Sequence, residues 1–242
     1  MQTTQRLAIS ATEPEPEKIA VAAQILRNGG LVAFPTETVY GLGANALDAK
    51  AIAGIFLTKG RPAQNPLIVH VASQEMLASV VSSWPPLAQQ LAARYWPGPL
   101  TLVVEKASLI PALVSAGGDT VAVRWPAHPV AQALILAAGV PLAAPSANRS
   151  SELSPTRPEH VWASLQGRFA LLLEGGACLA GLESTVLDVT GTIPKLLRPG
   201  PLSAAELEAF CGSLEKQTSQ GEHFRSPGLL AKHYSPRTPL EL

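Results

Sequence analysis

Cysteine is scarce in this chain of 242 residues: it occurs twice, as Cys178 and Cys211, far apart in the sequence. Neither lies in a CxxC pair or at a zinc-binding spacing from histidine, so the sequence indicates neither a zinc site nor a disulfide framework. We interpret both as small buried apolar residues.

Charge is also sparse, and it is balanced. Charged residues make up 15% of the chain, against about 25% in a typical globular protein. Hydrophobic residues reach 47%, which excludes a disordered chain. The 18 Lys and Arg residues equal the 18 Asp and Glu residues in number, so no net field attracts nucleic acid or an acidic membrane. Any anion must therefore be bound by a local cluster of cations.

Segments that target or anchor a protein are missing as well. Residues 1–18 lack the apolar core of a signal peptide. The long uncharged run 125–148 contains four prolines and a glycine, which favours a helix followed by a buried strand over a membrane span. We therefore expect a cytoplasmic protein with no membrane partner.

What is present is a series of short apolar runs interleaved with amphipathic segments. We predict strands at residues 31–35, 66–72, 99–105, 120–126, 140–145, 169–174 and 184–189. We predict helices at 13–28 with Thr12 as the cap, from Asp48 to Leu57, from near Ser73 and near Pro86, and at 129–138, 158–165 and 204–210. This alternation predicts a mixed α/β sheet covered by helices, within one domain at 12–211 that is followed by a polar linker or tail at 212–242.

Two polar clusters suit an anionic ligand. Lys59 and Arg61 flank Gly60, which lets both cations turn toward one phosphate, although a solvated helix C-terminus explains them equally well. The second cluster, 145–151, follows an apolar strand, where open α/β sheets bind ligands, and its hydroxyl and amide groups suit phosphate or ribose. An ordinary Ser/Asn turn is the alternative.

Other polar residues exclude some mechanisms. The loop at 35–43 matches neither the GxxxxGK[ST] phosphate loop nor the dinucleotide-binding GxGxxG. His70 alternates with apolar residues in a strand, which is typical of a structural histidine. Arg124 and Arg198 interrupt apolar segments, so each is either paired with a carboxylate or reserved for an anionic ligand. The set favours electrostatic catalysis on phosphate over a covalent nucleophile.

Several motifs together carry a resemblance to one family. FPTETVYGLGANA, KGRPAQNPLIVHV, VAVRWP, PLAAPSAN, ESTVLD and LLRPG resemble, in order and spacing, those of the YrdC-like threonylcarbamoyl-AMP synthases over roughly residues 20–207. The resemblance implies a twisted mixed sheet flanked by helices, with a concave positively charged cavity. It also implies a nucleotidyltransferase that makes L-threonylcarbamoyl-AMP and pyrophosphate from L-threonine, bicarbonate and ATP. A downstream complex would then transfer the threonylcarbamoyl group to adenosine in tRNA. The resemblance leaves open whether this protein itself also contacts tRNA weakly.

The resemblance also assigns residues to the site. It implies that ATP is bound by Lys59, Arg61, Asn65, Thr120, Ser146, Asn148, Ser154, Arg198 and Tyr234, with Mg²⁺ carried by the triphosphate and Lys59 and Arg61 acting in catalysis. It implies that threonine is bound by Thr38, His70, Arg124, Ser184 and the backbone of Ala144. No residue of the protein is expected to be a dedicated metal ligand.

The tail carries a further likeness. Residues 226–236 resemble the linker by which longer relatives leave this domain, and the resemblance implies that the linker covers the nucleotide. The commoner linker has an aromatic or basic residue near Leu230, so this chain departs from it there. Because the sequence stops at Leu242, we expect a chain cut at the linker, and the alternative is a protein that has lost the further domain.

Two other functions remain open on the sequence. Some YrdC-like domains bind structured RNA, so the chain is alternatively a translation or ribosome accessory module without synthase activity. A threonine pocket is not needed for RNA binding, which favours the enzyme. The third alternative is a carbamoyltransferase component that acts in metal-centre maturation. The absence of zinc-finger-like cysteine clusters from the sequence disfavours it.

Overall fold

The strands of the protein form one mixed sheet. The computed structural model describes residues 3–216 and 225–227. Within them the eleven strands have the order β1-β8-β2-β3-β7-β4-β6-β5-β9-β10-β11. Their bounds are β1 Gln5–Ala8, β2 Val32–Phe34, β3 Gly41–Asn45, β4 Ile68–His70, β5 Leu100–Glu105, β6 Thr120–Arg124, β7 Leu142–Ala143, β8 Leu171–Glu174, β9 Thr185–Asp188, β10 Lys195–Arg198 and β11 Glu215–Lys216. The predicted α/β class is confirmed.

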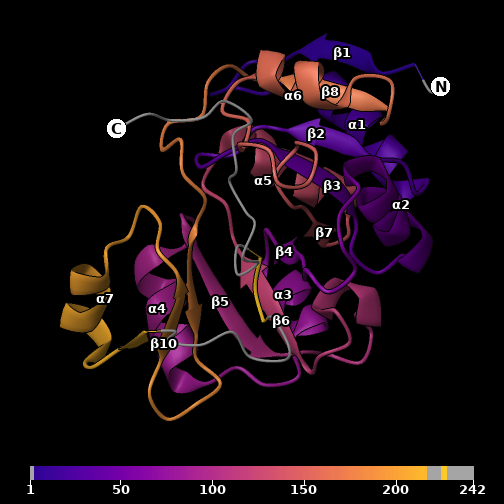
Figure 1. Cartoon of the computed structure of the whole chain (residues 1–242). Coiled ribbons are helices and arrows are strands. Elements are labelled where there is room, and N and C mark those ends of the chain that lie inside the picture. Colours follow the sequence, from indigo (N-terminus) through magenta and orange to yellow (C-terminus); the bar gives the residue numbers. More distant parts are fainter. Residues whose placement is uncertain (1–2, 217–224, 228–242) are drawn as a thin grey trace, which may run out of the picture.

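Helices cover both faces of this sheet. They are α1 Pro16–Arg27, α2 Ala49–Lys59, α3 Gln74–Val80, α4 Pro86–Tyr95, α5 Pro129–Ala138, α6 Pro158–Leu165 and α7 Ala204–Cys211, with a 3-10 turn η1 Ala112–Ser115. Figure 1 shows β1, β8 and β2 at one end of the molecule and β5, β6 and β10 at the other. The short strands β3, β7 and β4 join the two ends.

Local capping chemistry sets the helix bounds. Asp48 accepts hydrogen bonds from the backbone N–H groups of Lys50 and Ala51, as predicted, and so begins α2. Gly60 ends α2 in the left-handed conformation, with φ of 61°. The first helix is shorter than predicted: it begins at Pro16 with Glu15 at the cap position, so Thr12 is not its cap.

Two hydrophobic cores lie on opposite faces because side chains alternate along each strand. Val32 and Phe34 of β2 pack in the core that contains residues of α1 and α5, whereas Ala33 between them packs in the core that contains residues of α2. Leu172 of β8 likewise packs in the core that contains residues of α2, whereas its two neighbours along the strand pack in the core that contains residues of α1 and α5. The sheet is therefore buried on both sides, as its apolar runs indicate.

The predicted strand set is incomplete. Strand β3 lies in the segment that we predicted as a loop, and it pairs with β2 in antiparallel register. A Cβ atom at Gly43 would lie 2.7 Å from a ring carbon of Phe34, so glycine is needed for this close packing. Strand β1, before residue 12, pairs in parallel with β8, and β10 follows β9 as its antiparallel neighbour.

Gly200 gives a test of how the segment before β9 is positioned. A Cβ atom there would lie 2.4 Å from the backbone nitrogen of Thr185 and 2.5 Å from the carbonyl oxygen of Glu183. Gly200→Ala should therefore lower the free energy of unfolding by about 1–3 kcal/mol, measured by urea denaturation.

Gly191→Ala is the matched control, because its nearest contact, the carbonyl oxygen of Ile193, would be 3.6 Å away. That variant should stay within about 0.5 kcal/mol of the wild type. Equal effects of the two substitutions would contradict the close approach at Gly200.

Candidate active site

A cavity lies where the central strands end. It is lined by Thr36, Thr38, Val39, Tyr40, Gly41, Arg61, Ile68, His70, Arg124, Ala144, Pro145, Ser146, Glu183, Ser184, Arg198 and Pro227. Its empty space, counted out to the open mouth, is about 490 Å³. All five residues predicted to bind threonine line this cavity, together with Arg61, Ser146 and Arg198 of the predicted ATP set.

A second cavity adjoins the first and shares Glu183 and Arg198 with it. Its wall is largely apolar and includes Leu153, Leu182 and Ser154. The hydroxyl of Ser154 donates a hydrogen bond to the carboxylate of Glu183. The two cavities together offer a polar compartment beside an apolar one.

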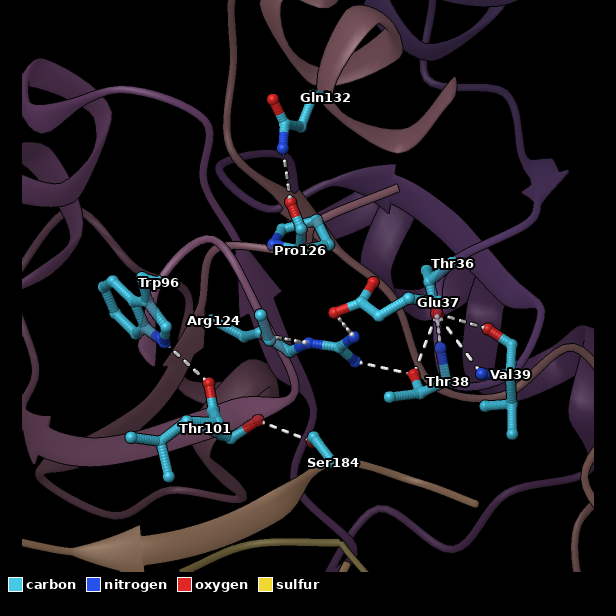
Figure 2. A network of polar contacts seen from close by, with 12 residues as sticks. Thr36, Glu37, Thr38, Val39, Trp96, Thr101, Arg124, Pro126, Gln132 and Ser184 are labelled. Carbon is cyan, nitrogen blue, oxygen red and sulfur yellow. Dashed lines mark hydrogen bonds and ion pairs between the residues drawn. The ribbon is translucent and has the colours of Figure 1, made fainter. Parts of the chain in front are cut away.

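Arg124 is held by a buried polar network, which Figure 2 shows. Its guanidinium forms an ion pair with Glu37, with 2.6 Å between Nη2 and Oε1. Nη1 donates to Thr38 Oγ1 at 2.9 Å, and Nε donates to the carbonyl of Gly98 at 3.2 Å. The sequence left the partner of Arg124 open, and the structure shows that it is Glu37.

The loop after β2 continues this network. The Thr36 hydroxyl donates to the carbonyl of Val39, so the 2.8 Å contact between the Thr36 and Thr38 hydroxyls is donated by Thr38. A directed chain of donors thus runs from Arg124 through Thr38 and Thr36 to a backbone carbonyl. This chain fixes the loop at the cavity wall.

Burial and charge set the ionisation of the buried groups. Burial raises the pKa of Glu37, but the Arg124 guanidinium and several hydrogen bonds outweigh it, so the pKa lies below its ordinary value. Burial, and then the nearby charge of Arg124, lower the pKa of His70 to about 3. His70 therefore presents a neutral imidazole to the cavity, and its Nδ1 atom has no hydrogen-bond partner within residues 3–216 and 225–227.

Lys59 is placed differently from Arg61. Its ammonium lies outside the cavity lining and donates to the backbone carbonyls of Ser146 and Asn148, each at 2.5 Å, and to Asn148 Oδ1 at 3.3 Å. Burial, then the charge of Arg61, hold the pKa of Lys59 well below its ordinary value. Lys59 therefore ties the end of α2 to the 146–148 loop.

Arg61 lies in the cavity wall and is held by backbone carbonyls. Its Nε donates to the carbonyl of Asn65 at 3.0 Å, and its Nη2 donates to that of Pro66 at 2.7 Å. The loop that follows α2 thus orients one guanidinium toward the cavity. Because Arg61 and Lys59 are both buried, they do not form a solvated helix end, and the phosphate contact stays a prediction.

The remaining predicted ATP residues that the structure describes lie outside the lining of the first cavity. Asn65 is buried, and its Nδ2 atom has no hydrogen-bond partner in the part of the chain that the structure describes. Thr120 begins β6 opposite Glu105, at the other end of the strand from Arg124. Asn148 donates to the carbonyl of Glu152. Tyr234 lies outside the described residues.

The described part of the tail reaches the cavity. Arg225 forms an ion pair with Asp188 at 2.9 Å and donates to the hydroxyl of Thr190 at 3.0 Å. Ser226 is buried, and Pro227 lines the first cavity. The prediction that the linker covers the nucleotide rests also on residues after Pro227, which lie outside the described ranges.

Sequence reasoning missed Glu37 and Glu183. Glu37 was visible only as the acid in FPTETVY, and Glu183 only as the first residue of ESTVLD. The cysteine prediction holds in part: both side chains are half-buried, and burial raises the pKa of Cys178 to about 11. Among residues 3–216 and 225–227, no cluster of His, Cys, Asp or Glu could hold a metal ion. In the same part of the chain, no helix is long and apolar enough to cross a membrane.

The fold and the cavity define an α/β domain with guanidinium groups arranged around a small-molecule site. A family model for Sua5, YciO and YrdC proteins, described as "Telomere recombination", matches residues 24–200. The chain belongs to the Sua5/YciO/YrdC family.

Named relatives share most of this chain. The threonylcarbamoyl-AMP synthase of Pyrococcus abyssi is 48% identical over 226 residues, which are 92% of this chain and 66% of the relative. That of Bacillus subtilis is 46% identical over 238 residues, covering 97% and 68%. The crystal structure of P. abyssi Sua5 complexed with L-threonine has a TM-score of 0.91 at 47% identity, covering 95% of this chain and 69% of that one. This chain therefore spans about two thirds of the length of these relatives.

The ion pair of Glu37 and Arg124 gives a prediction for stability. Arg124→Met would leave the Glu37 carboxylate buried without its cation, which should lower the free energy of unfolding at pH 7 by about 3–5 kcal/mol. The double variant Arg124→Met/Glu37→Gln should recover most of this loss in urea denaturation. A double variant as unstable as the single one would show that the pair is not the cause.

The acid dependence of stability follows from the pKa of Glu37. Because the folded pKa lies below the unfolded one, the contribution is present above the unfolded value of about 4.3 and is lost as the pH falls through the folded value. Glu37→Gln should thus be less stable than the wild type at pH 7, and the difference should shrink in acid. A difference independent of pH would contradict this assignment.

Proposed function

We propose that the protein is an L-threonylcarbamoyl-AMP synthase, which makes this adenylate and pyrophosphate from L-threonine, bicarbonate and ATP. The observation that carries the proposal is one cavity lined by all five residues expected to bind threonine and by three expected to bind ATP. The names of the relatives support it and favour the enzyme over the RNA-binding alternative. A downstream complex would use the product to modify adenosine in tRNA.

Arg124 would receive the carboxylate of threonine. Three of the five N–H donors of a guanidinium are used here by Gly98, Thr38 and Glu37 among the described residues. The ion pair holds the guanidinium plane in place, so a carboxylate can approach its remaining donors without reorganising the side chain. His70 and Ser184 would contact the rest of the amino acid.

The nucleotide would bind along Arg61 and Arg198, with its base toward the adjoining cavity that Ser154 lines. The threonine carbamate oxygen would attack the α-phosphorus in line, and pyrophosphate would leave. Arg61 and Arg198 would stabilise the charge that develops on the phosphate oxygens. Mg²⁺ would arrive with the triphosphate as part of the substrate.

The direct test is release of pyrophosphate. The protein should release it only when L-threonine, bicarbonate and ATP are all present, and the adenylate should be detectable by mass spectrometry. Release that is independent of threonine, or threonine binding without any release, would overturn the proposal.

Substitutions of Lys59 and of Arg61 should have distinguishable effects on turnover and Tm. Arg61→Ala should lower turnover at least about tenfold, equivalent to about 1.4 kcal/mol of transition-state stabilisation. Lys59→Ala should lower turnover by a similar factor and also lower Tm, because the 146–148 loop loses its buried cation.

Lys50→Ala is the control, since Lys50 lies exposed on the same helix. It should leave both turnover and Tm unchanged. Full activity of Lys59→Ala at unchanged Tm would show that the loop does not depend on this contact.

The tail should respond to ligands. Residues 215–216 of the predicted tail belong to the sheet as β11. We propose that the tail from Arg225 onward covers the site, because Arg225 anchors to Asp188 and Pro227 lines the cavity. Trypsin should cleave after Arg225 more slowly when threonine and ATP are both present, and Asp188→Asn should speed cleavage by removing the anchor. A cleavage rate that is indifferent to both ligands would contradict a cover.

A further inference from the structure

Glu183 lies in the wall that the two cavities share. The charged side chains that line the first cavity, among the described residues, are the guanidinium groups of Arg61, Arg124 and Arg198 and the carboxylate of Glu183. Arg124 is already paired with Glu37, behind the lining. Glu183 is therefore the carboxylate that faces a bound ligand at this cavity.

The proposed reaction places one demand that the guanidinium groups do not meet. Threonine enters as a zwitterion, and its ammonium must lose a proton before the nitrogen can bond to carbon dioxide. An ammonium needs acceptors, whereas guanidinium groups only donate. Binding and deprotonating the amine therefore require an acceptor in the same cavity.

Several backbone acceptors around the cavity are already engaged by protein donors. Carbonyl oxygens of the lining residues accept hydrogen bonds from protein donors at Thr38, Val39, Tyr40, Ile68, Pro145, Ser146 and Ser184. The hydroxyls of Thr36 and Thr38 belong to the donor chain from Arg124. A carbonyl accepts a second hydrogen bond, but it is a far weaker base than a carboxylate and does not take the proton from an ammonium.

Two other groups near the amine are poor proton acceptors. His70 is buried beside the positive charge of Arg124, which disfavours its protonated form. Glu37 is held in its ion pair with Arg124. Glu183, by contrast, is half-buried and accepts a hydrogen bond from Ser154, which orients the carboxylate and leaves its other lone pairs for a ligand.

We propose that Glu183 binds the ammonium of L-threonine and accepts the proton that it loses, a role that rests on the proposed function. The ammonium and the carboxylate become an amine and a carboxylic acid. The nitrogen lone pair then forms the N–C bond to carbon dioxide, one C=O electron pair moves onto oxygen, and the second proton leaves the nitrogen for water. Bicarbonate supplies the carbon dioxide by taking up one proton and losing its hydroxyl as water. Glu183 returns its proton to water, so that overall threonine and bicarbonate give carbamate, water and one proton.

Amine recognition is tested by binding alone. Glu183→Gln keeps an acceptor for Ser154 but removes the charge, so it should weaken L-threonine binding at least tenfold in calorimetry. The 2-hydroxy acid that carries a hydroxyl in place of the amine should bind the wild type and Glu183→Gln equally. Equal weakening of both ligands would overturn the amine contact, whether or not the protein is a synthase.

Proton acceptance is tested by the direction of the reaction. Forward pyrophosphate release by Glu183→Gln should fall at least about a hundredfold at saturating threonine, as for loss of a general base. Formation of ATP from threonylcarbamoyl-AMP and pyrophosphate needs no proton acceptor for the amine, and it should stay within about threefold of the wild type.

Glu105→Gln is the control, because Glu105 is an exposed carboxylate at the far end of β5, and it should behave as the wild type in every assay. Equal losses in both directions, or a loss restored by raised Mg²⁺, would place Glu183 in phosphoryl transfer and overturn the proposal. A wild type that makes no pyrophosphate would refute the synthase function, and the binding comparison would still decide the amine contact.

Discussion

The buried ion pair between Glu37 and Arg124 is the contact on which the site depends. Removing two charges from water is unfavourable unless they meet each other with good geometry, and here they do so at 2.6 Å. The pair joins the loop after β2 to the end of β6, which are separated in the sheet by β3, β7 and β4. Because Thr38 accepts a hydrogen bond from the same guanidinium, the loop and the arginine hold each other in position.

The short central strands explain how distant segments meet. His70 and Arg124 are partners in register on the parallel strands β4 and β6, and β7 pairs with β4 in antiparallel register, so that Ala144 lies beside Ile68 at the other end of β4. Strands β2 and β7 end after two or three residues, and polar residues that follow them, Thr36, Thr38 and Ser146, line the cavity. The loss of pairing energy in short strands is offset by burial on both faces.

Much of this arrangement could be predicted from local patterns. Asp48 marks a helix start, and the apolar runs of β5 and β6 mark buried strands, because capping and burial are local signals. Strand β3 could not be predicted, because its glycines are typical of a loop. Only the structure shows that they allow close packing against Phe34. The pairing of β1 could not be predicted either, since its parallel partner β8 lies more than 160 residues further along the chain.

The site shows the same division between local and tertiary information. A Lys-x-Arg pair after a helix predicts cations near phosphate, but it does not show that Lys59 turns inward to backbone carbonyls while Arg61 faces the cavity. Such contacts hold each cation before any substrate arrives, so little reorganisation is needed when negative charge develops. A chain with no net charge can therefore build an anion site by fixing a few cations on its own backbone. The same logic makes Glu183 informative, because an acid among guanidinium groups adds nothing to phosphate binding, whereas a positive group on the ligand would give it a partner.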